Sequence, residues 1–129
     1  MTTDTRPLSP HLQVYRLGYI MVLSGLHRIT GVCLTLGLVL LTAWLLLLAG
    51  DAAGYATFAS LAGSWLGRLV IAGFAWSFWY HFCTGLRHLV FDTGRALERR
   101  EMRQAALLTA LAAVVFALAT LAVVFGGAL

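Results

Sequence analysis

A chain of 129 residues has room for one domain. Its residues are 60% hydrophobic and only 11% charged, against about 25% charged in typical soluble domains, which excludes an ordinary soluble globule. The formal net charge of +4 comes from arginines that we expect to mark the sides of a membrane and not to bind nucleic acid.

Residues 1–20 are predicted to form a cytoplasmic leader and an interfacial segment. The sequence RPLSPH contains two prolines, which disfavour a helix and suggest an extended, docked segment. Residues 1–15 lack the apolar stretch of a signal peptide and the arginine-rich pattern of a transit peptide. We therefore expect direct insertion into a bacterial inner membrane.

Three long apolar segments follow, each meeting the requirement of about 20 residues for a membrane-spanning helix. We expect spans at about 22–50, 65–91 and 104–127, forming a three-helix transmembrane anchor over residues 21–129. The link at 51–64 is rich in Gly, Ala and Ser and is expected to be a short outer loop. The sequence thus predicts an all-α membrane protein with three transmembrane helices.

The arginines set the predicted topology. Eight of the nine lie near the start of the first span or around the link between the second and third spans. The link at 51–64 has no basic residue, and the ninth arginine, Arg68, lies just beyond it. By the positive-inside rule, the N-terminus and the second link face the cytoplasm, and the C-terminus is periplasmic. The residues concerned are Arg6, Arg16, Arg28, Arg87, Arg95, Arg99, Arg100 and Arg103.

Two features inside the spans are interpreted as packing. The alanine-rich third span has no ionisable group, and small residues let membrane helices approach closely. Cys33 and Cys83 both lie within spans, where we expect small apolar packing groups and not a disulfide.

The end of the second span, HFCTGLRHLVFD, carries a polar face. Four of its residues share one narrow helical face because each helical residue turns by about 100°. They are His81, Gly85, His88 and Asp92. Arg87 points elsewhere.

A second polar line begins the first span. Its members follow the spacing i, i+3, i+4 and i+7, which is one face of a helix. They are Ser24, His27, Arg28 and Gly31.

Both polar lines are expected on the cytoplasmic side of the membrane. If the hydrocarbon ends near Leu86, His81 lies about five residues, or roughly 8 Å, inside it. We expect His27 at the depth of His88 and not of His81. An ionisable side chain within the membrane is a functional-site hypothesis.

The pattern fits a haem bound between helices, although it would also fit other arrangements. Iron takes a neutral imidazole from below the surface, and the two propionates need cationic partners where they emerge. Gly85 leaves room for a flat macrocycle. Because His81 and His88 share one face, they cannot be opposite ligands of one iron. A bis-histidine haem at His81 would therefore require a ligand from another chain, and predicts an obligate membrane partner.

Structural roles are open for the same residues. Spacing alone explains His81 equally well as a core histidine bonded to a neighbouring helix. His88 and Asp92 lie near the interface, where solvated polar groups are routine. Arg28 can anchor its helix at the headgroups, and Ser24 can bond its own backbone.

Three motifs, in this order and spacing, resemble the cytochrome b556 subunits of succinate dehydrogenase, the larger membrane anchors of respiratory complex II. They are RPLSPHLQVY in the leader, SGLHRITG at 24–31 and HFCTGLRHLVFD at 81–92. The resemblance covers nearly the whole chain, although the third span carries no diagnostic motif.

The resemblance implies roles for individual residues. His81 matches the axial ligand of haem b, with the other ligand on the smaller anchor subunit. His27 and Arg28 match residues that approach the haem propionates, while His88 is a haem-edge or structural residue. Ser24 and Arg28 match the ubiquinone pocket. The resemblance also places Arg87 and Asp92 at the cytoplasmic edge of the haem.

The implied function is that of a non-catalytic anchor of an enzyme. Succinate would be oxidised at a flavin in the flavoprotein subunit. Electrons would pass through an iron–sulfur subunit to ubiquinone at the membrane interface, near the one haem b shared with the smaller hydrophobic anchor. No residue of this chain is expected to be catalytic.

Two rival functions were weighed against the haem-bearing anchor. One is a haem-free anchor of a fumarate reductase-type complex, whose polar residues only dock soluble subunits. The other is a small proton-coupled transporter with His81 and Asp92 as a relay. The spans contain no acidic residue and no broken helix of the kind expected near a midplane site, which disfavours the transporter.

Overall fold

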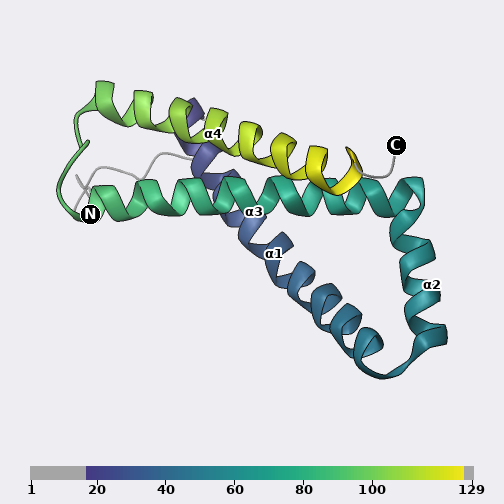
Figure 1. The fold of residues 1–129 in the computed structure, drawn as a ribbon. Helices are drawn as coiled ribbons and strands as arrows, with labels where there is room; N and C mark the ends of the chain where they lie inside the picture. The colour runs from purple at the N-terminus through teal and green to yellow at the C-terminus, as the bar shows by residue number, and fades with distance from the viewer. Residues whose placement is uncertain (1–16, 127–129) are drawn as a thin grey trace, which may run out of the picture.

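The computed structural model describes residues 17–126, and these form four helices joined by short turns (Figure 1). The helices are α1 (Tyr19–Gly50), α2 (Ala52–Gly63), α3 (Trp65–Asp92) and α4 (Arg99–Gly126). Predictions about the leader at 1–16, including RPLSPHLQVY and its docking, lie outside the described residues.

Three of the helices, α1, α3 and α4, are long and apolar enough to cross a membrane. Their large side chains point outward: Val123 is 81% exposed and Leu46 is 70% exposed. The residues buried between the helices are mostly small or polar, as in Thr30, Ser77 and Ala113. This distribution suits a lipid solvent, in which small residues and hydrogen bonds hold helices together. The prediction of an all-α protein with three transmembrane helices is confirmed.

Helices α3 and α4 pack side by side and antiparallel (Figure 1). The face of α4 toward α3 buries Ala106, Ala113 and Ala117, whose methyl side chains allow close approach. A hydrogen bond crosses the same interface, where Trp79 Nε1 donates to Thr120 Oγ1 at 2.9 Å. The alanine-rich third span is therefore a packing element.

Helix α1 crosses α3 and then leaves it (Figure 1). Near the start of α1, the Tyr80 hydroxyl donates to the Leu23 carbonyl at 2.8 Å. Further along, a Cβ at Gly37 would lie 2.6 Å from Phe74 Cε1, so only glycine fits there without a shift of the ring. Beyond this contact, α1 diverges from α3 toward α2.

The link at 51–64 is a helix, and the expectation of an outer loop is wrong. Asp51 begins α2 by accepting hydrogen bonds from the backbone of Ala53 at 3.1 Å and Gly54 at 3.0 Å. Ser64 both ends α2 and begins α3, where its hydroxyl accepts from Gly67 N at 3.1 Å. Helix α2 thus joins the diverging ends of α1 and α3 (Figure 1).

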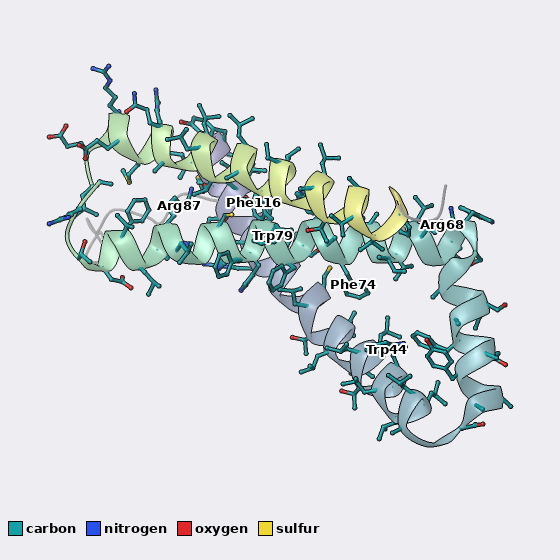
Figure 2. All side chains as sticks on the ribbon, viewed as in Figure 1. Trp44, Arg68, Phe74, Trp79, Arg87 and Phe116 are labelled. Atoms are coloured by element: carbon teal, nitrogen blue, oxygen red, sulfur yellow. The ribbon has the colours of Figure 1, made fainter. Side chains whose placement is uncertain are left out.

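A large apolar cavity of about 960 Å³ lies between the diverging helices. Five aromatic residues line it, and nearly all other lining side chains are aliphatic. The aromatic residues are Trp44, Phe58, Phe74, Phe78 and Trp79. Figure 2 shows Trp44 and Phe74 on the facing sides of α1 and α3. Such a surface needs hydrocarbon or another apolar chain against it in a membrane.

Candidate functional site

His81 is held from one side by the backbone of α1. Its Nδ1 lies 3.0 Å from the His27 carbonyl oxygen and 3.4 Å from the Thr30 hydroxyl. Because a carbonyl only accepts, Nδ1 carries the proton and donates it to His27. The lone pair of the ring is then on Nε2, which makes no hydrogen bond to any residue of 17–126. This is the arrangement in which an imidazole is prepared as a metal ligand.

Thr30 fixes the carbonyl that orients His81. Its side chain is 1% exposed, and its hydroxyl donates to the same His27 oxygen at 2.8 Å. Sequence reasoning did not single out Thr30, although it lies within the SGLHRITG motif. A buried hydroxyl next to a polar helical face is the signal that could have found it.

Three imidazoles meet where α1 crosses α3. The His27 and His81 rings stack with centroids 4.0 Å apart and planes 13° apart. The His88 ring lies 5.3 Å from His27 at an angle of 50°. His27 therefore contacts the His81 layer, and the prediction that His27 shares the depth of His88 and not of His81 is wrong. The tilt of α1 across α3 brings the two rings together.

The stacked geometry limits how iron could be held. Rings stacked face to face at 4.0 Å leave no room for an iron and a flat macrocycle between their nitrogens. His27 and His81 thus cannot be opposite axial ligands of one iron. Within residues 17–126 no group of three or more His, Cys, Asp or Glu side chains could hold a metal ion.

Gly31 borders the His81 ring. A Cβ on Gly31 would lie 3.0 Å from His81 Cε1, so the absence of a side chain lets α1 approach the ring. A Cβ on Gly85, one turn after His81, would meet no atom of the described residues within 4 Å. The ring therefore packs tightly toward α1, and the space beside Gly85 is open, which fits a flat group bound beside α3.

His27 leaves one polar atom unsatisfied. Its Nδ1 is buried and has no hydrogen-bond partner among residues 17–126. Buried polar atoms nearly always find partners, so an exception needs a cause. The unpartnered nitrogen of His27 lies on a ring stacked against His81, the potential ligand. This fits a site that is completed by a bound group or by another chain.

The other predicted site residues lie at the edge of this cluster. Ser24 is half-buried and Arg28 is exposed on α1, and neither makes a side-chain hydrogen bond to the three imidazoles. His88 also packs edge-on to Phe91, with centroids 6.1 Å apart. Asp92 is exposed at the last residue of α3. The structure therefore brings together His27, His81 and His88, while Ser24 is half-buried and Arg28 is exposed on the helix that carries His27.

Arg87 has different surroundings from those expected. It lies between α3 and α4 (Figure 2), where its guanidinium carbon is 5.6 Å from the centre of the Phe91 ring. Its side chain is only 7% exposed. The expectation that Arg87 closes the edge of a haem bound at His81 stays a prediction.

Known proteins resemble the chain along most of its length. The profile of the family described as "Succinate dehydrogenase/Fumarate reductase transmembrane subunit" matches residues 2–121. The succinate dehydrogenase cytochrome b556 subunit of Paracoccus denitrificans is 42% identical over 120 residues, covering 93% of this chain and 92% of that protein. The subunit of the same name from Rickettsia felis is 38% identical over 91 residues, covering 70% of each chain.

A mitochondrial protein is also similar. The succinate dehydrogenase cytochrome b560 subunit of Mus musculus is 39% identical over 100 residues, covering 74% of this chain and 58% of that protein. The predicted resemblance to cytochrome b556 subunits is confirmed. With its three apolar helices and its relatives in Paracoccus and Rickettsia, the chain is a bacterial multi-pass membrane protein. It belongs to the family of transmembrane subunits of succinate dehydrogenase and fumarate reductase.

Proposed function

We propose that this chain is the haem b-bearing membrane anchor of a succinate:quinone oxidoreductase. The observation that carries the proposal is the state of His81, whose Nδ1 is held by the His27 carbonyl at 3.0 Å while Nε2 is left available. The most similar relatives named above are cytochrome b556 subunits, a name that implies a b-type haem in those proteins. Both observations favour a haem-binding role over a purely structural histidine.

In this proposal His81 is the single axial ligand from this chain. The His27 carbonyl and Thr30 hydroxyl hold the ring, and stacking by the His27 ring limits its rotation. Since His27 and His88 lie on the same side as His81, the second ligand comes from the smaller anchor subunit. A bound haem supplies a one-electron carrier in the membrane.

The cationic side chains at the edge of the cluster neutralise the propionates. His27 and Arg28 are the proposed contacts, with His88 at the haem edge. Arg28 is exposed on α1 one residue from His27, so a turn of its long side chain can reach a carboxylate beside the stack. Paired charges are required because two unpaired carboxylates in a membrane are costly.

Ser24 and Arg28 form the proposed quinone contact on the same helix. The Ser24 hydroxyl donates a hydrogen bond to a quinone carbonyl, and Arg28 stabilises negative charge that develops on the oxygen during reduction. Arg28 is exposed and Ser24 is half-buried on α1, and other subunits complete the pocket in this proposal. We expect the iron–sulfur subunit to cover them and to connect the flavoprotein subunit to the membrane.

The proposed topology follows the arginines. The N-terminus and the turn between α3 and α4 face the cytoplasm, and the C-terminus faces the periplasm. This orientation puts Ser24, Arg28 and His88 on the cytoplasmic side, where an iron–sulfur subunit would dock. Succinate oxidation would then feed the tricarboxylic acid cycle and the respiratory chain.

A second candidate is a haem-free anchor of a fumarate reductase-type complex, because the family description covers both enzymes. The reduced-minus-oxidised absorbance spectrum of the complex purified from native membranes separates the two. A b-type band and a co-purifying flavoprotein, iron–sulfur subunit and smaller anchor are expected. A spectrum without a b-type band would overturn the haem assignment and favour the second candidate.

A further inference from the structure

Arg87 is a buried cation without a matching charge in residues 17–126. Its side chain is 93% buried, and its Nε is enclosed without a hydrogen-bond partner. Within residues 17–126 the guanidinium makes no ion pair, and its contact at the Phe91 ring is a weak cation–π approach at 5.6 Å. A guanidinium does not lose its proton in a protein, so a buried one needs an anion.

Arg87 lines a groove between α3 and α4 with a volume of about 420 Å³. Apart from Arg87 and the Thr109 hydroxyl, the lining is apolar. Leu86 and Val90 on α3 and Leu108 on α4 are exposed at its rim, so the groove opens toward the surrounding lipid. Figure 2 shows Arg87 and Phe116 between the two helices along this groove.

The ends of α3 and α4 above the groove are rich in positive charge. Arg87 lies five residues before the end of α3 at Asp92, or about 7.5 Å along the axis. This end carries five arginines against three acidic residues, an excess of 5 − 3 = +2. The arginines are Arg87, Arg95, Arg99, Arg100 and Arg103, and the acidic residues are Asp92, Glu98 and Glu101. Basic pockets between membrane helices favour anionic headgroups.

We propose that the α3–α4 groove binds one anionic phospholipid, with its phosphate on Arg87 and an acyl chain along the apolar walls. The ligand must combine a negative charge with a long apolar body, because the groove offers one buried cation and almost no other polar group. The planar guanidinium donates to two phosphate oxygens at once, which satisfies Nε. A free phosphate ion would leave the apolar walls unfilled. This lipid site lies between α3 and α4, whereas the His81 ring packs against α1.

The test counts the lipids that stay on the chain. The full chain, purified with its co-purifying subunits in a mild detergent, is stripped of lipid and then incubated with phosphatidylglycerol or with phosphatidylcholine. Native mass spectrometry reports the phospholipids bound. We expect each chain to retain one phosphatidylglycerol molecule, which phosphatidylcholine does not replace. The Arg87→Gln variant is expected to lose this lipid. The control Arg95→Gln removes an exposed charge at the same end of the molecule and is expected to keep the lipid.

A second variant tests the groove without touching the charge. Ala112→Leu adds bulk to the lining of the groove and is expected to lose the same lipid while Arg87 is intact. If Arg87→Gln fails to assemble, the lipid bound to Ala112→Leu tests the proposal instead. Retention of phosphatidylglycerol in both variants, equal binding of phosphatidylcholine, or displacement by inorganic phosphate alone would overturn the proposal. So would a density map with an acidic side chain of another subunit against Arg87.

Discussion

The imidazole rings of His27 and His81 lie face to face, with centroids 4.0 Å apart and planes inclined by 13°. The backbone carbonyl of the same His27 accepts from His81 Nδ1 at 3.0 Å. One residue of α1 thus fixes both the plane and the protonated nitrogen of a ring on α3. This double contact determines where the free nitrogen of His81 points.

Replacing His81 by Leu is expected to remove the b-type signal from the assembled complex. The substitution deletes Nε2 of His81, which the hydrogen bond at Nδ1 leaves available as a ligand. The measurement is the reduced-minus-oxidised absorbance of the purified complex, normalised to flavin. Thr30→Val serves as a milder comparison, because it removes one hydroxyl beside Nδ1 and keeps the ligand. An unchanged band in His81→Leu would refute the assignment of His81 as a ligand.

Replacing Arg28 by Leu is expected to lower quinone reduction by about 10²-fold, the scale found when a group that stabilises developing negative charge is removed. Oxidation of succinate by a soluble dye does not need the quinone site and is expected to change little. The ratio of the two rates in the same membranes is the readout. Equal losses of both rates would instead indicate defective assembly.

Replacing Gly31 by Ala is expected to move the His81 ring. The added Cβ would lie 3.0 Å from Cε1, so the ring must shift by a few tenths of an ångström. We expect a changed electron paramagnetic resonance spectrum of the oxidised haem with little loss of assembled complex. Gly73→Ala is the matched control. Its Cβ would meet no atom of the described residues within 4 Å, and Gly73 lies on α3, the helix of His81, far from the ring. Identical spectra for Gly31→Ala and wild type would contradict the close packing of α1 on His81.

Replacing Gly37 by Val is expected to destabilise the contact between α1 and α3. Even a Cβ would lie 2.6 Å from Phe74 Cε1, and overpacking of this kind costs roughly 1–3 kcal/mol. Thermal unfolding of the purified complex measures the loss. Phe74→Leu in the Gly37→Val background should recover part of it, because the smaller side chain leaves room. A double variant no more stable than Gly37→Val alone would show that the clash is not the cause.

The hydrogen bond from Trp79 to Thr120 is expected to couple α3 and α4 by about 0.6 kcal/mol, the average for interhelical hydrogen bonds in membranes. Trp79→Phe removes the donor, Thr120→Val removes the acceptor, and the double variant completes a thermodynamic cycle. Unfolding free energies of the four proteins give the coupling. A coupling of zero would mean that both groups find equally good partners when separated.

Composition and helical spacing were sufficient to predict the architecture of the spans. Runs of about 20 apolar residues have few alternatives in a membrane, so α1, α3 and α4 could be recognised from sequence. Helix α2 was missed because its Gly, Ala and Ser content was read as a loop. The signal for it was present in Asp51, an acidic N-cap residue whose side chain accepts from two backbone amides.

The sequence was sufficient to predict which histidines form the cluster, but not how deep each one lies relative to the others. Counting residues along each helix treats the helices as upright, and on that basis His27 was matched with His88. Because α1 crosses α3 obliquely, depth along one helix does not translate into depth along the other. The stack of His27 on His81, and the role of Thr30 beneath it, depend on the crossing and could not be read from spacing alone. The assignments of Ser24 and Arg28 to a quinone stay predictions.

The capped helix α2 gives the chain the outline of a wedge, broad where α2 lies and narrow where Gly37 meets Phe74. Helix α2 closes the broad side of this wedge, and the Phe74 ring lies at its apex. A change in the length of α2 should therefore change how far apart the ends of α1 and α3 are held.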